Sequence, residues 1–223
     1  MNKKQSAALK AAEYIKDNMI LGLGTGSTAY YLIQKVGELL KSGYNLKCVA
    51  TSFETEKLAK DLNIPLYDPD ELGHVDLIID GVDEIDPAFN AIKGGGGALL
   101  REKIVASLSK KVIWIMDDSK LVPALGKFPL PVEIIRFGHK QLLKKMEVLG
   151  LNPVLRMAQE KPFLTDSNNY IVDLHLGENF KITEIKTLLD NLVGVVETGL
   201  FLNLCDIIVV GFDQEAKVFI NNK

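Results

Sequence analysis

The feature that most constrains this chain of 223 residues is the segment from Asp80 to Glu102, DGVDEIDPAFNAIKGGGGALLRE. It places four acids within seven residues, followed by one lysine and four consecutive glycines. Like charges this close together destabilise a compact state unless cations or backbone donors face them. Lys93 and the amides of residues 94–97 are the expected donors. A segment this costly to fold indicates a functional site.

The residues before this segment predict where it lies in a fold. Residues 74–80, HVDLIID, have the short, β-branched apolar run of a buried strand, and Gly81 marks its exit. Asp80 is therefore expected at the carboxyl end of a strand, the edge at which open α/β sheets bind ligands. The four glycines would let the backbone approach a ligand and turn its amides inward as an anion-binding concavity.

After the glycines, residues 98–108 are predicted to form a helix that is buried nearly all round. One apolar stripe runs from Leu100 to Leu108 and another from Leu99 to Ala106. Glu102 lies in this helix, and its neighbours one turn away in both directions are apolar. A carboxylate in an apolar wall tends towards a raised pKa, which suits a general base near neutral pH. A structural carboxylate paired with a distant Lys or Arg is the alternative.

A second glycine-rich turn lies near the N-terminus. Residues 19–22 have the pattern of a strand, and residues 23–28, LGTGST, lead into a helix beginning near Ala29. A strand, a glycine turn and hydroxyls at a helix start are typical of a phosphate-binding loop. Ser27 stands where the dinucleotide fingerprint has its third glycine, and the lysine of a P-loop is missing, so neither a nicotinamide cofactor nor ATP is indicated. An ordinary capped turn is the alternative.

Composition excludes several classes of function. The formal net charge is −3, the pI is near 5.7, and no basic cluster occurs, so we expect no nucleic-acid partner. The N-terminal residues lack the apolar core of a signal peptide, and no apolar run approaches the roughly 18 residues of a membrane span. We therefore expect a cytoplasmic protein. Cys48 and Cys205 are predicted to be buried thiols, and the three separated histidines are not expected to bind a metal.

Alternation of helix and strand patterns in the first 120 residues predicts a mostly parallel sheet with helices on both faces, a Rossmann-like α/β fold. The expected helices lie near residues 4–17, 29–41, 53–61 and 98–108, and the expected strands near residues 19–23, 46–50, 64–67, 75–80 and 112–117.

After residue 130 the pattern changes to that of a split βαβ, ferredoxin-like α+β unit. Its expected elements are strand 132–137, helix 139–149, strands 154–158 and 170–174, helix 182–192 and strand 194–198. Strand-like runs at 206–210 and 218–220 are expected to rejoin the first sheet. The sequence thus predicts a discontinuous large domain, residues 1–130 and 205–223, and a small domain, residues 131–204.

Five segments together resemble ribose-5-phosphate isomerase of type A: GLGTGSTA, DGVDEID, KGGGGALLREK, DDSK with LGKFPLPVEI, and GVVETGLF. They stand in the family's order and span the chain from about residue 4 to residue 210. Small departures are Val82, where Ala is common, and Gly97 and Leu100, which are variants within the KGGGA and LTREK motifs. None of these replaces a polar group with a proposed chemical role.

The resemblance implies interconversion of D-ribose 5-phosphate and D-ribulose 5-phosphate, by proton transfer between C2 and C1 through an enediolate, without a metal or cofactor. Glu102 stands at the position of the family's catalytic glutamate. Asp80, Asp83 and Lys93 match residues that open the furanose ring and hold the sugar hydroxyls, and Lys93 with nearby amides would stabilise the enediolate oxygen. The matching substrate-binding positions are Thr25, Gly26, Ser27, Thr28, Gly94, Gly95, Gly96, Lys120 and Lys4.

The family's habit of oligomerisation implies a homodimer or a tetramer, and the sequence does not separate the two. Lys4 and Lys120 could instead be ordinary surface charges. Two other classes of function share such a pocket: a sensor that only binds sugar phosphates, and a related enzyme such as an amino-sugar deaminase, a phosphosugar lactonase or an acyl-CoA transferase. Motifs that cover most of the chain favour the isomerase.

Overall fold

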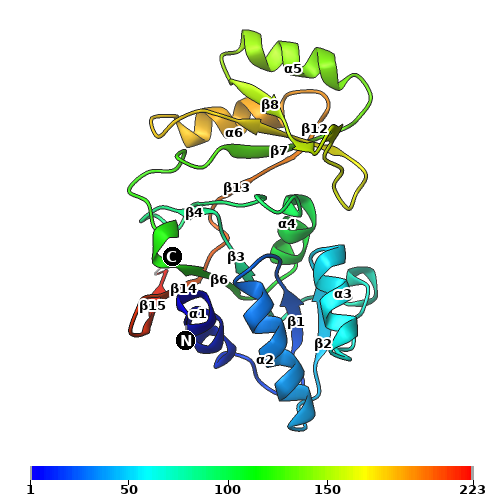
Figure 1. Cartoon of the computed structure of the whole chain (residues 1–223), viewed down its shortest axis with the longest axis vertical. Helices are drawn as coiled ribbons and strands as arrows, with labels where there is room; N and C mark the ends of the chain where they lie inside the picture. Colours follow the sequence, from blue (N-terminus) through cyan, green and yellow to red (C-terminus); the bar gives the residue numbers. More distant parts are fainter. Residues whose placement is uncertain (1, 222–223) are drawn as a thin grey trace. The chain divides into compact units, whose positions relative to one another are not determined.

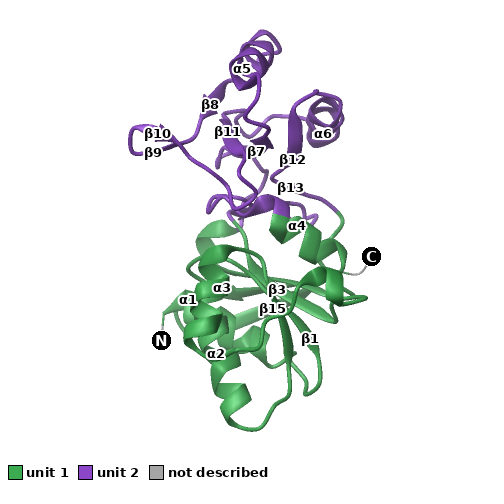
Figure 2. Ribbon diagram, turned by 90° about the vertical axis from the view of Figure 1, so that its right-hand side faces the viewer, with its two compact units in different colours: residues 1–82, 101–120, 203–223 green, residues 83–100, 121–202 purple. Residues whose placement is uncertain are grey.

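The structure, a computed structural model, describes residues 2–221, which form two compact units. Unit 1 comprises residues 1–82, 101–120 and 203–223, and unit 2 comprises residues 83–100 and 121–202 (Figure 2). Residues 83–100 group with unit 2 because two short strands in this segment pair with a third inside that unit. The predicted boundaries at residues 130 and 205 differ from this grouping. As a division into folding domains they stay a prediction.

Unit 1 is built on a six-stranded sheet with the order β15-β14-β6-β3-β1-β2. Its strands are β1 (Ile20–Leu23), β2 (Lys47–Ala50), β3 (Leu77–Gly81), β6 (Val112–Asp117), β14 (Ile207–Gly211) and β15 (Ala216–Ile220). All neighbouring pairs are parallel except β14 and β15. The five parallel strands, numbered along the chain, have the order 2-1-3-4-5, so the topological switch point lies between β1 and β3. The predicted mostly parallel α/β fold is confirmed.

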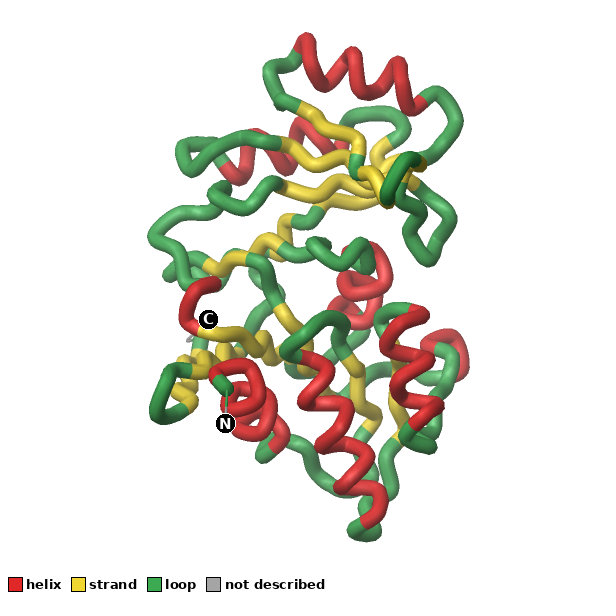
Figure 3. Tube along the Cα trace, viewed as in Figure 1, coloured by secondary structure: helices red, strands yellow, loops and turns green. Residues whose placement is uncertain are grey.

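Helices cover both faces of this sheet because alternate residues of each strand point to opposite faces. Leu21 and Ile79 belong to the core shared with α1 (Lys3–Ala12), α2 (Ala29–Lys41) and α3 (Phe53–Asp61). Gly22 and Ile78 point to the opposite face, where Val105 of α4 (Leu99–Ser107) packs; a Cβ at Gly22 would lie 2.9 Å from a methyl of Val105. Figure 3 shows these helices around the strands of unit 1, and Figure 1 shows α1 beside α2.

Helix α1 is held close to the carboxyl ends of β6 and β14. A Cβ at Gly211 would lie 1.8 Å from the carbonyl oxygen of Lys3, so only glycine allows this approach. The Lys3 ammonium lies 3.0 Å from Asp118 and 3.2 Å from Asp213, and these hydrogen bonds raise the pKa of Lys3. The side of α1 that packs on the sheet consists of small residues, Ala7, Ala8, Ala11 and Ala12. This packing places the start of α1 at the carboxyl edge of the parallel strands, where a ligand site was predicted.

Three local predictions in unit 1 were wrong. The predicted helix 98–108 is not buried all round, because Ile104 of α4 and Leu108, which follows α4, are 44% and 38% exposed. Residues 64–67 do not form a strand but a single parallel bridge between Leu66 and Cys48, next to Pro65, which has no N–H to donate. Helix α1 ends at Ala12 instead of residue 17.

Unit 2 contains a four-stranded sheet with the order β12-β7-β11-β8, in which all neighbours are antiparallel. Its elements in chain order are β7 (Leu130–Ile134), α5 (His139–Val148), β8 (Pro153–Leu155), β11 (Tyr170–Leu174), α6 (Ile182–Asp190) and β12 (Val195–Thr198). The order 4-1-3-2 with this chain sequence is the predicted ferredoxin-like unit. Side chains of α5 and α6, including Met146 and Leu189, share one core with β7 and β11.

Smaller elements complete the two units. In unit 2, β4 (Glu84–Ile85), β5 (Ala91–Ile92) and β13 (Leu200–Phe201) form a sheet, and β9 (Met157–Ala158) pairs with β10 (Lys161–Pro162). In unit 1, two 3-10 turns span η1 (Pro69–Glu71) and η2 (Asp118–Lys120). Strands of two residues carry no periodicity, so β4, β5, β10 and β13 were not predicted, and the predicted strand 154–158 is divided between β8 and β9. Within residues 2–221, no helix has the length and apolar character needed to cross a membrane.

The Asp76 carboxylate, just before β3, is hydrogen-bonded to three partners. Its Oδ2 accepts a hydrogen bond from the Ile20 amide at 2.9 Å, and its Oδ1 lies 2.9 Å from both His74 Nε2 and Lys110 Nζ. The Ile20 amide lowers the pKa of Asp76 most; burial opposes this, and Lys110 and His74 lower the pKa further. Because the folded pKa is depressed, the stabilisation is present above the ordinary value of 3.8 and is lost as the pH falls below it.

Asp76→Asn is therefore expected to lower the free energy of unfolding at pH 7 by about 1–2 kcal/mol, since a charged acceptor is lost. Urea unfolding at pH 7 and pH 3 measures the effect, which should shrink at the lower pH. Asp61→Asn, at an exposed carboxylate, is the matched control. A loss of equal size at both pH values would contradict the assigned role of the charge.

Candidate active site

Asp80 ties together the two loops at the switch point of the unit 1 sheet. Its carboxylate, at the end of β3, is fully buried, and Oδ1 accepts hydrogen bonds from the amides of Thr25 at 2.8 Å and Gly81 at 2.7 Å. A Cβ at Gly24 would lie 2.2 Å from this oxygen, so the close approach requires glycine. The loop after β1 is therefore held against the end of β3.

The Thr25 side chain points into the protein and joins a cluster of hydroxyls. Its Oγ1 lies 2.7 Å from Thr51 Oγ1, 2.9 Å from Ser52 Oγ and 3.2 Å from Thr55 Oγ1. Thr55 Oγ1 also donates to the carbonyl oxygen of Gly24 at 2.9 Å. Thr25 thus anchors the loop to the start of α3. No role was predicted for Thr51, Ser52 and Thr55, because a hydroxyl near a helix start indicates capping but not a tertiary partner.

The exposed part of this loop consists of Gly26 and Ser27. Gly26 has a φ of +97°, a left-handed conformation that favours glycine. Ser27 Oγ accepts a hydrogen bond from Lys4 Nζ at 2.8 Å, so the structure brings together two predicted site residues that lie far apart in the sequence. Thr28, which precedes α2, is 7% exposed, and its side chain does not cap that helix.

Lys120 and Lys4 act on one carboxylate, that of Asp117 at the end of β6. Burial raises the pKa of Asp117, but hydrogen bonds from Ser119 and the charges of Lys120 and Lys4 outweigh it, so the pKa lies below its ordinary value. Both predicted lysines therefore lie at the carboxyl edge of the sheet that carries Ser27. No role was predicted for Asp117, because the sequence of the apolar strand that it ends does not indicate which charged residues lie near it in the fold.

Glu102 lies on the buried side of α4 and is 5% exposed. Residues one turn before and after it on the helix, including Leu99 and Val105, are buried and apolar. The exposed residues Ile104 and Leu108 lie on the other side. The expected apolar environment of Glu102 is confirmed, whereas its catalytic role stays a prediction.

The carboxylates of the acidic segment, residues 80–86, accept hydrogen bonds from backbone amides of several segments. From the glycine loop, the Gly95 amide donates to Asp83 Oδ2 at 2.7 Å. Buried Glu84 accepts hydrogen bonds from the amides of Gly126 at 2.9 Å and Phe128 at 2.6 Å. Asp86 binds the amides of its own turn, residues 88 and 90. Glu84 and Asp86 are therefore structural, and Asp83 faces the glycine loop.

Lys93, at the end of β5, is 1% exposed, although lysine is rarely buried to this extent. Its ammonium lies 5.3 Å from the centre of the Phe201 ring, a cation–π contact within unit 2. Its amide donates to the carbonyl oxygen of Gly199 at 2.9 Å. Both partners belong to the GVVETGLF segment, for which the sequence suggested no physical partner.

The glycine loop has two exposed residues between two buried ones. Gly94 and Gly97 are buried and have φ values of +105° and +84°, whereas Gly95 and Gly96 are exposed. A Cβ at Gly95 would lie 2.6 Å from Asp83 Oδ1. The loop therefore presents the peptide groups around Gly95 and Gly96 at its open side.

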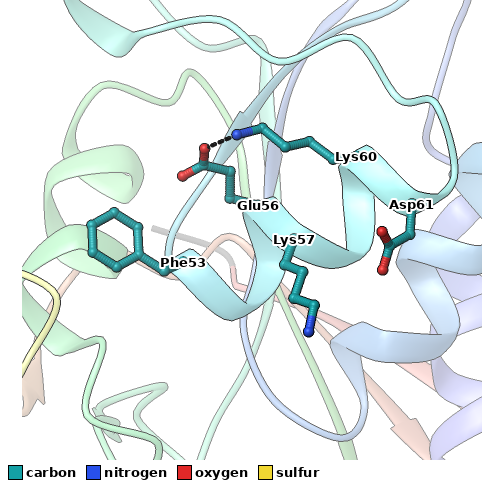
Figure 4. Close-up of a pocket in the computed structure, with 5 residues that line it drawn as sticks. All are labelled: Phe53, Glu56, Lys57, Lys60 and Asp61. Atoms are coloured by element: carbon teal, nitrogen blue, oxygen red, sulfur yellow. Dashed lines mark hydrogen bonds and ion pairs between the residues drawn. The ribbon is translucent and has the colours of Figure 1, made fainter.

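A hollow elsewhere on unit 1 lies along the outer side of α3. Figure 4 shows its lining side chains, which include Phe53, Lys57 and the ion pair between Glu56 and Lys60. None of the predicted site residues lines it. In residues 2–221, no group of three or more His, Cys, Asp or Glu side chains could hold a metal ion.

Residues 47–215 match the family profile of ribose 5-phosphate isomerase A (phosphoriboisomerase A). The chain belongs to the ribose 5-phosphate isomerase A family. The family match includes Asp80, Asp83, Lys93, Glu102 and Lys120, whereas Lys4 and the loop of residues 23–28 precede it.

Three relatives illustrate how far the similarity extends. Ribose-5-phosphate isomerase A of Enterococcus faecalis is 51% identical over 222 residues, which cover 97% of each chain. The solved ribose 5-phosphate isomerase of Plasmodium falciparum has a TM-score of 0.94 at 37% identity, covering 99% of this chain and 98% of that one. A D-ribose-5-phosphate isomerase solved in complex with phospho-erythronic acid has a TM-score of 0.94 at 34% identity, covering 99% and 100%.

The hydroxyl cluster around Thr25 gives a stability prediction for this member of the ribose 5-phosphate isomerase A family. Thr55→Val removes one hydroxyl and leaves the buried Gly24 carbonyl without that donor, at an expected cost of about 1–3 kcal/mol in the free energy of unfolding. Urea unfolding measures it. Thr55→Ser should retain most of the stability, and Thr183→Val, at an exposed hydroxyl of α6, should retain nearly all of it. Equal losses in the valine and serine variants at residue 55 would disprove the role of the hydroxyl.

Proposed function

We propose that this chain is a ribose-5-phosphate isomerase, which interconverts D-ribose 5-phosphate and D-ribulose 5-phosphate. The reaction moves a proton between C2 and C1 through an enediolate, and no metal or cofactor takes part in the proposed steps. Membership of the isomerase family over nearly the whole chain supports the substrate and the reaction. A relative that binds phospho-erythronic acid supports a phosphorylated sugar as the ligand.

The observation that carries the proposed mechanism is the setting of Glu102. Its carboxylate is 5% exposed on the apolar side of a helix that begins directly after the glycine loop. General bases act most efficiently when burial and neighbours adjust them to the working pH, and apolar surroundings favour the neutral form of a carboxyl group. We assign Glu102 the transfer of the proton between the two carbons.

Binding of the phosphate is assigned to the loop after β1 and to the two lysines at the same edge of the unit 1 sheet. Gly26 and Ser27 are exposed, and Lys4 already donates to Ser27. Lys120 adds a second positive charge near Asp117. A dianionic substrate entering a chain of net charge −3 needs such local cations. The Thr25 side chain supports the loop, and its amide is bound to Asp80, so we assign Thr25 a supporting role.

We assign the opening of the furanose ring to Asp83 together with Lys93. Stabilisation of the enediolate oxygen is assigned to Lys93 together with the amides of the glycine loop. Asp83 is partly exposed beside the Gly95 amide, whereas Asp80 is fully buried and bound to two amides. Preorganised donors of this kind usually supply the largest part of the stabilisation of a developing oxyanion. Asp80 then acts by holding the two loops of the switch point together.

We further propose that the protein acts in the cytoplasm and as a homodimer, with a tetramer as the alternative. A relative that is 51% identical is the ribose-5-phosphate isomerase A of the bacterium Enterococcus faecalis, and the negative net charge does not favour binding of nucleic acid. Small-molecule sugar phosphates are the expected ligands.

The first experiment measures formation of ribulose 5-phosphate from ribose 5-phosphate in the presence of EDTA. Glu102→Gln is expected to lower kcat by about 10²-fold or more, because the general base is lost. Glu54→Gln, at an exposed glutamate of α3, is the matched control and should turn over like the wild type. Turnover that survives in Glu102→Gln would move the base to Asp80 or Asp83. Saturable binding without turnover in the wild type would favour a sensor.

A second experiment separates the two aspartates. Asp83→Asn is expected to lose more activity on ribose 5-phosphate than on an acyclic substrate analogue, because only the furanose needs its ring opened. Asp80→Asn keeps an acceptor oxygen for the Thr25 and Gly81 amides and should fold. Rates on both substrates are compared for both variants. Equal losses on the two substrates for Asp83→Asn would exclude a ring-opening role.

A further inference from the structure

We propose that Arg156, held by Asp173, is a positioning residue that sets the direction of the peptide groups in the glycine loop, residues 94–97. None of the motifs in the sequence includes either residue. All the groups involved lie in unit 2. The inference rests on the proposed function, because the loop is assigned there to the enediolate oxygen.

Arg156 and Asp173 form a bidentate pair. Arg156 Nε lies 2.8 Å from Asp173 Oδ2, and Nη2 lies 2.5 Å from Oδ1. The two side chains are only 15% and 16% exposed. The sheet register explains the pairing: Asp173 of β11 lies opposite Val154, and the Arg156 amide donates to Ile171, so the two side chains are diagonal neighbours on one face of the sheet.

The remaining nitrogen of this guanidinium binds the glycine loop. Arg156 Nη1 donates to the carbonyl oxygen of Gly94 at 2.8 Å and to that of Gly95 at 3.1 Å. Sixty-two and sixty-one residues separate the partners along the chain. Asp173 binds the other two nitrogens of the guanidinium, Nε and Nη2. The Arg156 side chain therefore cannot rotate away from the two carbonyl oxygens without breaking this charge-assisted pair.

Phe163 supports the same arrangement from the base of the hairpin formed by β9 and β10 (Figure 2). Its amide donates to the carbonyl oxygen of Arg156 at 2.9 Å, and the Arg156 guanidinium lies 5.9 Å from the centre of its ring. A Cβ at Gly97 would lie 2.4 Å from this ring. The ring therefore packs directly against the last glycine of the loop.

The consequence follows from the geometry of the trans peptide, in which the N–H points opposite to the C=O. The Gly94 carbonyl points to Arg156, and the Gly95 amide of the same peptide points the other way, to Asp83 Oδ2 at 2.7 Å. The Gly95 carbonyl also binds Arg156, so the Gly96 amide is turned away from the guanidinium in the same manner. Arg156 thus orients one amide towards the proposed ring-opening carboxylate and a second towards the open side of the loop, where an oxyanion would bind.

Only arginine suits this position. A bidentate carboxylate pair and two carbonyl bonds use three nitrogens of one planar group, whereas lysine presents a single ammonium without a fixed fork. Arg156→Lys therefore keeps the charge but loses the orientation of the loop. It is the conservative variant that separates orientation from charge.

The test measures kcat and KM for ribose 5-phosphate together with the free energy of unfolding. Arg156→Lys is expected to lower kcat by about 10- to 100-fold with KM changed by less than about threefold, because oriented donors act mainly on the developing oxyanion. Arg136→Lys is the matched control, since Arg136 binds Asn168 in the same unit and none of its contacts reach the glycine loop. Asp173→Asn should show a smaller loss of kcat, and the double variant should lose less than the sum of the two singles.

Loss of stability in Arg156→Lys with an unchanged kcat would overturn the proposal, since it would make the pair merely structural. A second readout needs no turnover: hydrogen exchange of the Gly95 amide, followed by NMR. Exchange should be about tenfold faster in Arg156→Lys than in Arg136→Lys, because the Gly95 amide loses its fixed orientation towards Asp83. Unchanged exchange would disprove the positioning role even if the wild type proved inactive on ribose 5-phosphate. Absence of wild-type turnover alone would count against the proposed function only.

Discussion

The arrangement of the loops at the carboxyl edge of the unit 1 sheet depends on one buried carboxylate, that of Asp80. It accepts hydrogen bonds from backbone amides on both sides of the switch point: that of Thr25 in the loop after β1 and that of Gly81 at the end of β3. A buried carboxylate is tolerated only when donors satisfy it, so the two loops cannot move apart without a large desolvation cost. The loop in which Ser27 binds Lys4 is thereby fixed in place. The hydroxyls of Thr51, Ser52 and Thr55 stabilise it further through hydrogen bonds with the Thr25 hydroxyl.

The same principle explains how the acidic segment of unit 2 folds. Each carboxylate there finds amides of a different segment: Asp83 binds the glycine loop, Glu84 binds residues 126 and 128, and Asp86 binds its own turn. The charges are therefore separated onto distinct donors. Arg156 binds the carbonyl oxygens of Gly94 and Gly95 in the same loop. The peptide group between Gly94 and Gly95 is therefore bound at its carbonyl oxygen by Arg156 and at its N–H by Asp83.

Much of the fold could be predicted, because hydrophobic periodicity reports which side of an element is buried. The alternation of helices and strands gave the parallel sheet, and the change of pattern after residue 130 gave the ferredoxin-like unit. The errors have physical causes. In the predicted helix 98–108, the apolar stripe that contains Ile104 and Leu108 is exposed at both residues, since periodicity cannot say which of two apolar sides faces a partner. In the sheet of β4, β5 and β13, strand β5 pairs with β13, a segment about a hundred residues further along the chain, and no local pattern reports this pairing.

The sequence by itself determined the fold class, the family and the residue types at the candidate site, because these depend on local patterns and motifs: glycines where the backbone approaches closely, an acid at a strand end, a glutamate among apolar neighbours. Only the tertiary structure decided how those residues are used. It turned the Thr25 hydroxyl inward, made Glu84 and Asp86 structural, and brought Lys4 to Ser27 and Arg156 to Gly94. Except for the local turn of Asp86, those contacts join residues that are distant in the chain, and their distances follow from sheet register and packing, which one-dimensional spacing does not contain.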